Sequence, residues 1–243
     1  MTSSSKAIVI STESFGEADM YIQFFTQRWG MLTTLAKSAR KSKKRYVGGL
    51  DLFCHDEIYI RGELKERPYL VELNVLNSFT GIRDSLDKML MAGKILQWIK
   101  KLANQNTPMP NLYSLLGQTL SLIEKEANSE KLELLTLIFR LKLISLLGLK
   151  PKVDACVNCG SRQDEDVIFD IESGGILCNK CLSGNYIREL APLPYSERVF
   201  LNIADALPLT KFQDIQFPDD HTQNLARLVT LFTTFHTHIK LPN

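Results

Sequence analysis

Four of the five cysteines form two Cys-x-x-Cys pairs, and these carry the clearest chemical signal in the sequence. The first pair is Cys156 and Cys159, and the second, separated from it by 18 residues, is Cys178 and Cys181. Two tight turns at this spacing can face each other around one tetrahedral ion, and four thiolates are the ligands of a structural zinc site. Four cysteines leave no open position for water, so a catalytic zinc is disfavoured. We predict one structural Zn²⁺.

The segment around these cysteines also suits a metal-dependent module. Gly160 follows the first pair and permits a tight turn, and Gly174-Gly175 permits a hairpin before the second pair. Few apolar residues lie nearby, and metal binding supplies roughly 10 to 16 kcal/mol in small zinc peptides. The alternatives are four unliganded thiols or one redox-active pair. Cys54 lies within an expected strand, and we expect an ordinary buried thiol there.

Positive charge is concentrated in one part of the chain. Seven of the 29 basic residues lie between Met20 and Leu50, a stretch without Asp or Glu, although the net charge is only +2. Such a cluster favours a polyanion partner, because long basic side chains on a loop can follow a phosphate backbone without reading its bases. The alternative is a solvated loop. The predicted DNA contacts are Lys37, Arg40, Lys41, Lys43, Lys44, Arg45 and Tyr46.

Aromatic residues accompany this basic run and could stack on unpaired bases. They are Trp29, Tyr46, Phe53 and Tyr59. For any one of them, packing in a core is the competing explanation.

Enzyme signatures are absent from the sequence, which contains no P-loop, G-x-G-x-x-G, H-E-x-x-H or G-x-S-x-G motif. We therefore expect a binding protein without catalytic residues. The start of the chain lacks a signal-peptide core, and the most apolar stretch, Leu132 to Leu149, is interrupted by Arg140 and Lys142. These features predict a cytoplasmic protein that does not contact a membrane, with reduced cysteines.

Two hydrophobic periods divide the chain. Up to about residue 80, five short runs alternate with period two, at Ala7–Ser11, Met20–Phe25, Met31–Lys37, Leu52–Arg61 and Tyr69–Leu76. Five such strands suit a small closed barrel, which leaves no exposed edge. Thr2 to Ser5 is expected to be a polar tail.

The helical period follows. Helices are expected from Thr80 to Pro108, from Asn111 to Ala127 and from a Ser129 N-cap to Gly148, then from Pro192 to Leu207 and from His221 to Ile239. We predict an α+β multidomain chain with a five-stranded oligonucleotide-binding (OB) type barrel in 1–80, a helical domain in 81–152 and 185–243, and the four-cysteine module inserted at 153–184.

Several of these motifs resemble the bacterial recombination-mediator family RecO. In the first half they are Gly16-Glu17-Ala18-Asp19 and Leu35 to Lys43, followed by Gly49-Leu50 and Phe53. In the second half they are Leu147-Gly148-Leu149-Lys150-Pro151 and both cysteine pairs with Gly160, Gly174 and Gly175. Two positions differ from the family pattern: Ser38 stands in place of a glycine, and Lys142 in place of an acidic residue.

The resemblance implies an OB barrel, binding to single- and double-stranded DNA, and annealing of complementary strands. It also implies cooperation with RecR and single-stranded DNA-binding protein (SSB) to load RecA. The acidic, apolar carboxyl tail of SSB would dock on the helical domain, where it needs a cation and an apolar groove. Arg140 is the candidate cation, and Phe139 and Leu143 are the candidate groove residues. Alternatively, Arg140 extends to water or pairs with an acid such as Glu133.

A second function from another class also fits the residues. A zinc-ribbon adaptor in transcription or protein assembly would use the same four cysteines, and its basic loop would contact an acidic protein. Sequence-indifferent, salt-sensitive DNA binding distinguishes the first function from this one.

Overall fold

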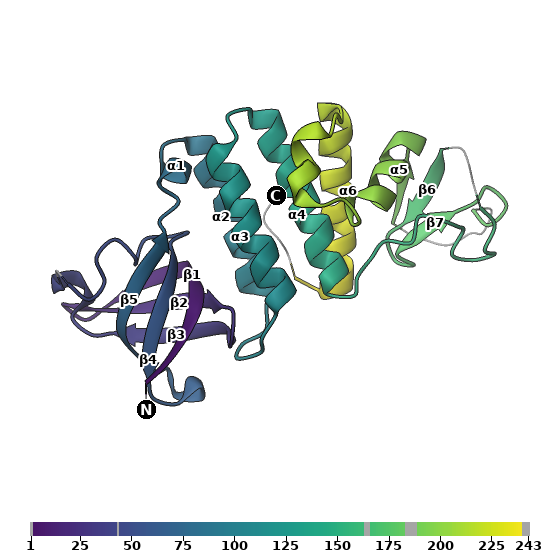
Figure 1. Ribbon diagram of the computed structural model, residues 1–243. Coiled ribbons are helices and arrows are strands. Elements are labelled where there is room, and N and C mark those ends of the chain that lie inside the picture. Colours follow the sequence, from purple (N-terminus) through teal and green to yellow (C-terminus); the bar gives the residue numbers. More distant parts are fainter. Residues whose placement is uncertain (1, 43, 163–165, 183–188, 240–243) are drawn as a thin grey trace. The chain divides into compact units, whose positions relative to one another are not determined.

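The computed structural model describes residues 2–42, 44–162, 166–182 and 189–239 (Figure 1). The chain divides into two compact units, Met1–Ala127 and Asn128–Asn243. Each unit combines strands and helices, which confirms the predicted α+β class. Among the described residues, no helix has both the length and the apolar character that a membrane crossing requires.

The first unit begins with five strands: β1 (Thr2–Phe15), β2 (Asp19–Thr26), β3 (Gly30–Ala36), β4 (His55–Arg61) and β5 (Tyr69–Asn77). They close in the order β1-β2-β3-β5-β4. All neighbours are antiparallel except β3 and β5, which meet in parallel where Leu35 lies opposite Tyr69. This small closed barrel is of the OB type, as predicted.

The first strand differs from the prediction. Residues Thr2 to Ser5, expected to form a polar tail, are part of β1 and pair with β4, with Thr2 opposite Arg61. The reason is closure, because β4 would otherwise present an unpaired edge. The fourth strand is shorter than expected and starts at His55, since Leu52 and Phe53 lie in a turn where Phe53 has a φ of 76°.

Alternation along the strands fills the barrel. Ile22 and Phe24 of β2 point into the core together with Ile58 and Ile60 of β4. Phe25 faces the other way but is also buried, and its ring centroid lies 6.0 Å from that of Tyr113. The barrel therefore has a second apolar face, which is covered by helix.

Three helices complete the first unit: α1 (Thr80–Arg83), α2 (Leu86–Leu102) and α3 (Pro110–Lys125). The Tyr113 hydroxyl of α3 lies 2.8 Å from Nε2 of His55 on β4. Between α2 and α3, Asn104 accepts a backbone hydrogen bond from Met31 of β3, and Asn106 donates one back to it. These bonds attach the helices to the barrel.

The second unit contains α4 (Ser129–Leu146), α5 (Tyr195–Ala204) and α6 (Asp219–Thr237), with the short 3-10 helix η3 (Leu209–Asp214). The N-cap of α4 is Asn128, one residue before the predicted Ser129, and its side chain accepts from the backbone N–H of Lys131. Helix α5 starts at Tyr195, because Leu190–Leu193 forms strand β8 instead of the predicted helical start at Pro192.

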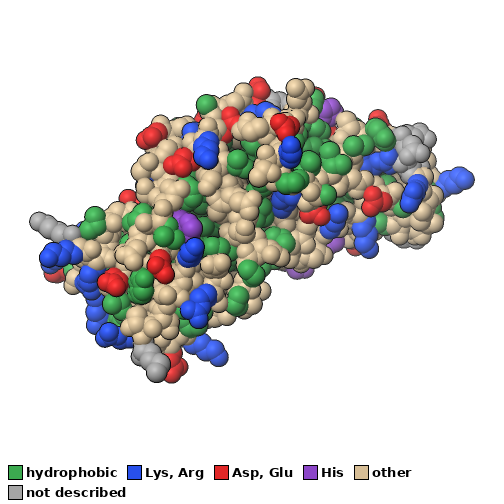
Figure 2. Space-filling model, in the orientation of Figure 1, with side chains coloured by type: hydrophobic (Ala, Val, Ile, Leu, Met, Phe, Trp, Pro, Cys, Tyr) green, Lys and Arg blue, Asp and Glu red, His purple; other side chains and the backbone are tan. Residues whose placement is uncertain are grey.

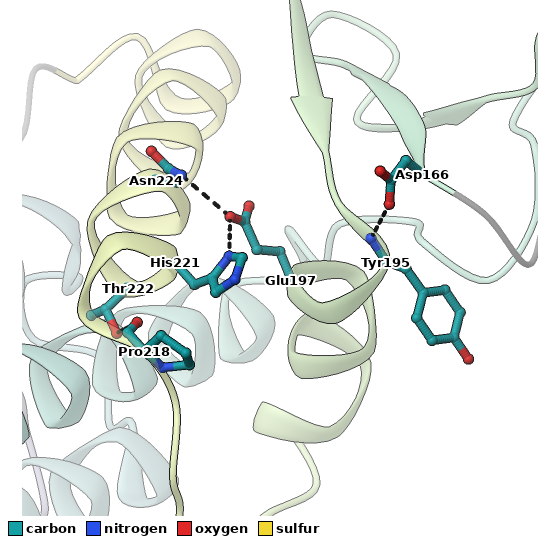
Figure 3. Close-up of polar contacts among 7 residues, drawn as sticks. All are labelled: Asp166, Tyr195, Glu197, Pro218, His221, Thr222 and Asn224. Carbon is teal, nitrogen blue, oxygen red and sulfur yellow. Dashed lines mark hydrogen bonds and ion pairs between the residues drawn. The ribbon is translucent and has the colours of Figure 1, made fainter.

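A three-stranded sheet carries the cysteine segment. Its order is β7-β6-β8, with β6 at Val167–Asp170 and β7 at Gly175–Leu177. Figure 3 shows how α5 connects this sheet to α6: Asp166 accepts from the backbone N–H of Tyr195 at 2.8 Å, and Glu197 accepts from His221 at 2.9 Å. The inserted module is thus tied to the helices that follow it in the chain.

Candidate metal centre and nucleic-acid interface

The four predicted metal ligands converge on one point. The sulfur atoms of Cys156, Cys159, Cys178 and Cys181 all lie within 4.8 Å of one another, and those of Cys159 and Cys178 are 3.7 Å apart. In a tetrahedral site with Zn–S bonds of about 2.3 Å, neighbouring sulfurs lie about 3.8 Å apart. The spacing and chemistry of these donors therefore fit one zinc ion.

Backbone turns hold the cysteines in place. Gly160, with a φ of 74°, donates to the carbonyl of Cys156 at 2.8 Å, and Cys181 donates to that of Cys178 at 2.9 Å. Val157 donates to Ile176 of β7 at 2.9 Å, which joins the first turn to the sheet. Gly175 makes this junction possible, because a Cβ there would collide with Val157 and the carbonyl of Lys152.

The local electrostatics favour the thiolate at one of the four cysteines, Cys178. The backbone N–H of Cys181 lies against the Cys178 sulfur and lowers the pKa of that thiol to about 6. A thiolate is the form that binds metal. Cys54, in contrast, is buried in the barrel, as expected, and burial raises the pKa of its thiol.

The basic loop, defined as residues 37–46, is the first part of the connection from β3 to β4 and includes the 3-10 helix η1 (Ala39–Lys41). Its backbone is anchored to the turn between β1 and β2. Ser38 donates to Asp19 Oδ1 at 2.7 Å, and Arg40 donates to the carbonyl of Ala18 at 3.0 Å. The loop thus leaves the barrel at a fixed place.

The charged side chains of this loop point outward. Lys37, Arg40, Lys41, Lys44 and Arg45 are exposed, whereas Lys43 lies outside the described residues. Figure 2 shows Lys and Arg side chains gathered along the outer edge of the barrel, at the left of the view. The arrangement places several cations on one surface, as contact with a phosphate backbone requires.

Tyr46 occupies a different position from the one predicted. It is only 4% exposed, belongs to the barrel core and donates from its hydroxyl to the carbonyl of Leu70 at 2.8 Å. Arg45 lies over its ring at 4.8 Å. Tyr46 therefore anchors the loop and presents no free face to a base. Phe53 is also buried, and Trp29 and Tyr59 are partly buried.

Two aromatic residues that sequence reasoning missed are better placed. Tyr69, at the start of β5, is 46% exposed, and Tyr21 of β2 is partly exposed. Lys37 lies over the ring of Tyr69 at 4.7 Å, and Arg67 lies over that of Tyr21 at 5.4 Å. The strands that carry Tyr21 and Tyr69 come together only when the barrel closes. No local sequence pattern therefore pointed to these two residues.

The predicted peptide groove on α4 is not open in this structure. Arg140 is 3% exposed and donates to Thr230 Oγ1 of α6 at 2.8 Å and to the carbonyl of Ala226 at 3.4 Å. Burial lowers the pKa of its guanidinium to about 10. Phe139 and Leu143 are fully buried. These three residues join α4 to the interior of the second unit, and a peptide could reach them only if the helices separated.

Fold and site together define a class: a protein with an OB-type barrel, a helical part and a four-cysteine metal centre. Comparison with known protein families leads to the same class of protein. The family model "Recombination protein O N terminal" matches residues 1–79, and "Recombination protein O C terminal" matches residues 83–243. The chain belongs to the RecO family.

Curated relatives of similar length support this assignment. A protein of Syntrophus aciditrophicus named "DNA repair protein RecO" is 28% identical over 95% of this chain and 89% of its own length. A relative with the same name from Desulfatibacillum aliphaticivorans is 34% identical over 72% of this chain and 69% of its own length. Another, from Acetivibrio thermocellus, is 30% identical over 73% of this chain and 70% of its own length.

Proposed function

We propose that this chain is a DNA-binding and strand-annealing recombination mediator in DNA repair. The observation that carries the proposal is the basic loop, whose five described cations are exposed on a barrel of the OB type. The names of the relatives support the repair context. We propose no catalytic residue.

Phosphate contact accounts for affinity without sequence preference. Exposed lysines and arginines release counterions from DNA when they neutralise phosphates, and this gain does not depend on the bases. The loop backbone is anchored at Ser38 and Arg40 on one side and at Tyr46 on the other, so its cations are held together. A surface of this kind can hold either single or double strands.

Annealing follows from the same electrostatics. Two complementary strands repel each other through their phosphates, and a shared positive surface offsets this repulsion while base pairing supplies the specificity. In a repair pathway we propose that this activity operates with RecR and SSB and leads indirectly to the loading of RecA. Docking of the SSB tail at Arg140, Phe139 and Leu143 would require α4 and α6 to separate.

The proposed metal has a structural role. Zinc held by Cys156, Cys159, Cys178 and Cys181 would fasten two turns that, among the described residues, pack against a small apolar cluster of Leu177, Val157 and Leu182. Four sulfur ligands would fill the coordination sphere and leave no position for substrate.

The test is a titration of the purified protein with two unrelated oligonucleotides at several salt concentrations, together with an annealing assay on complementary strands. We expect equal affinity for both sequences, a steep fall with salt and faster annealing than the strands show alone. If the protein does not bind DNA at low salt, the proposed function is wrong and a protein-binding adaptor is favoured.

A further inference from the structure

We propose that the barrel contains a pocket for an unpaired nucleobase, formed by Tyr21 and Tyr69, beside the basic loop. The inference rests on the proposed DNA binding and specifies its ligand: a single strand contributes a free base to this pocket, and a continuous duplex does not. Neither tyrosine belongs to the basic loop.

The pocket lies where the barrel closes. It has a volume of about 280 Å³ and is lined by residues of β2, β3, β5, the end of β4 and the β4–β5 loop, including Tyr21, Leu35, Arg61, Arg67 and Tyr69. This is near the lower limit of about 300 Å³ for ligand pockets, a size that suits one planar base better than a base pair. The parallel contact between Leu35 and Tyr69 brings the lining residues together.

A cationic side chain already lies over the ring of each tyrosine. Lys37 lies 4.7 Å from the centroid of Tyr69, and Arg67 lies 5.4 Å from that of Tyr21. The exposed Phe15 extends the aromatic surface, since its ring centroid is 4.8 Å from that of Tyr21. Bases stack on tyrosine faces in single-strand binding proteins, and neighbouring cations reinforce the contact.

The charges inside the pocket favour a base over a phosphate. Glu63 and Glu66 line the same pocket as Arg61 and Arg67. Carboxylates repel a phosphate, but they accept hydrogen bonds from the amino groups on base edges. Lys37, at the rim, begins the exposed basic loop. A strand whose phosphates follow the loop could therefore turn a base inward at Tyr69.

The β4–β5 loop is held in uncommon backbone conformations at this place. Arg67 has a φ of 54° and Gly62 a φ of 112°. Left-handed conformations of residues other than glycine are costly, and they concentrate at ligand-binding sites. Arg67, which adopts this left-handed conformation, is also the residue whose guanidinium lies over the ring of Tyr21.

The test compares three ligands of equal length: a mixed-sequence single strand, an abasic single strand and a duplex. Fluorescence anisotropy gives the affinity of the wild type and of Tyr69→Ala. We expect Tyr69→Ala to weaken binding of the mixed-sequence strand roughly five- to hundredfold, the range that removal of one base stack produces. Binding of the abasic strand and the duplex should change less than about twofold, because their phosphates are still bound by the loop.

The matched control is Tyr195→Ala. Tyr195 is 48% exposed, compared with 46% for Tyr69, and it too has a cation, Arg198, over its ring. Tyr195→Ala should leave the affinities for all three ligands unchanged. Tyr69→Trp, which keeps an aromatic ring at position 69, should retain binding of the mixed-sequence strand. Equal wild-type affinity for mixed and abasic strands, or equal weakening of all three ligands by Tyr69→Ala, overturns the pocket but not the DNA-binding function. Failure of the wild type to bind any of the three overturns both.

Discussion

The hydroxyl of Tyr46 donates a hydrogen bond to the backbone carbonyl of Leu70 at 2.8 Å, and so joins the end of the basic loop to β5. A second bond supports this junction, because the N–H of Leu73 donates to the carbonyl of Arg45 at 3.2 Å. The basic loop is therefore attached to the barrel at its carboxyl end as well as at Ser38 and Arg40.

Tyr46→Phe isolates the contribution of this hydroxyl. The change should lower the free energy of unfolding by about 1 kcal/mol, the usual contribution of one hydrogen bond. Chemical denaturation measures this value. Affinity for single-stranded DNA should stay the same, since the ring is buried. A selective loss of single-strand binding would show instead that Tyr46 contacts a base.

Removal of charge from the loop should weaken DNA binding for every sequence alike. For Lys41→Ala, Lys44→Ala and Arg45→Ala combined, we expect a salt dependence flatter by about 0.7 to 0.9 log units for each phosphate that the protein no longer neutralises. Salt titrations of binding give this slope. The control removes three cations from α2 and α3, by Lys94→Ala, Lys101→Ala and Lys125→Ala. If both triple variants bind DNA equally weakly, net charge and not the loop is responsible.

The cysteine cluster should contain one zinc ion per chain, which metal analysis of the purified protein can establish. Cys178→Ala with Cys181→Ala should abolish the zinc and lower the thermal stability of the second unit, since metal binding and folding of such modules are coupled. Cys54→Ala removes a buried thiol outside the cluster and should leave the zinc content unchanged. Less than about half an equivalent of zinc in the wild type would contradict a structural site.

The main effect of Arg140→Ala should be a lower free energy of unfolding. The guanidinium connects α4 to Thr230 and Ala226 of α6, and removal of buried hydrogen bonds from a charged donor costs roughly 1 to 3 kcal/mol. Denaturation measures this change, and titration with an SSB tail peptide tests the competing role. Reduced peptide affinity in a variant of unchanged stability would assign Arg140 to the peptide site.

Asp56 gives the barrel a pH dependence. It is 0% exposed, and its carboxylate oxygens have no hydrogen-bond partner among the residues that the structure describes. Burial raises the pKa of this carboxyl from 3.8 to about 8. Between these values the folded protein holds a proton that the unfolded chain has released. The free energy of unfolding therefore falls as pH rises, by up to about 1.4 kcal/mol per pH unit.

Asp56→Asn should remove this slope and stabilise the protein at pH 8. Denaturation curves recorded from pH 5 to pH 8 measure the effect, and Asp51→Asn, which alters an exposed acid of the preceding turn, is the control. The same slope in the Asp56→Asn variant would show that another group is responsible.

Local patterns predicted the parts of the fold that depend on neighbours in sequence. Alternation at Ile22 and Phe24 indicated a barrel strand, and the two Cys-x-x-Cys pairs indicated one metal centre. The positions that were missed depend on residues far along the chain. Thr2 is a strand residue because Arg61 needs a partner, and Arg140 is buried because Thr230 faces it. Such pairings leave no periodic trace in the sequence.

The position of the cysteine module between α4 and α6 has an entropic consequence. These two helices pack together, although the module and α5 separate Leu146 from Asp219 in the chain. Joining the ends of a connection costs chain entropy that grows with its length, by about 0.6 kcal/mol for each doubling. A metal ion that ties Cys156 to Cys181 shortens the free part of this connection. It would thus favour the helix pair without touching either helix.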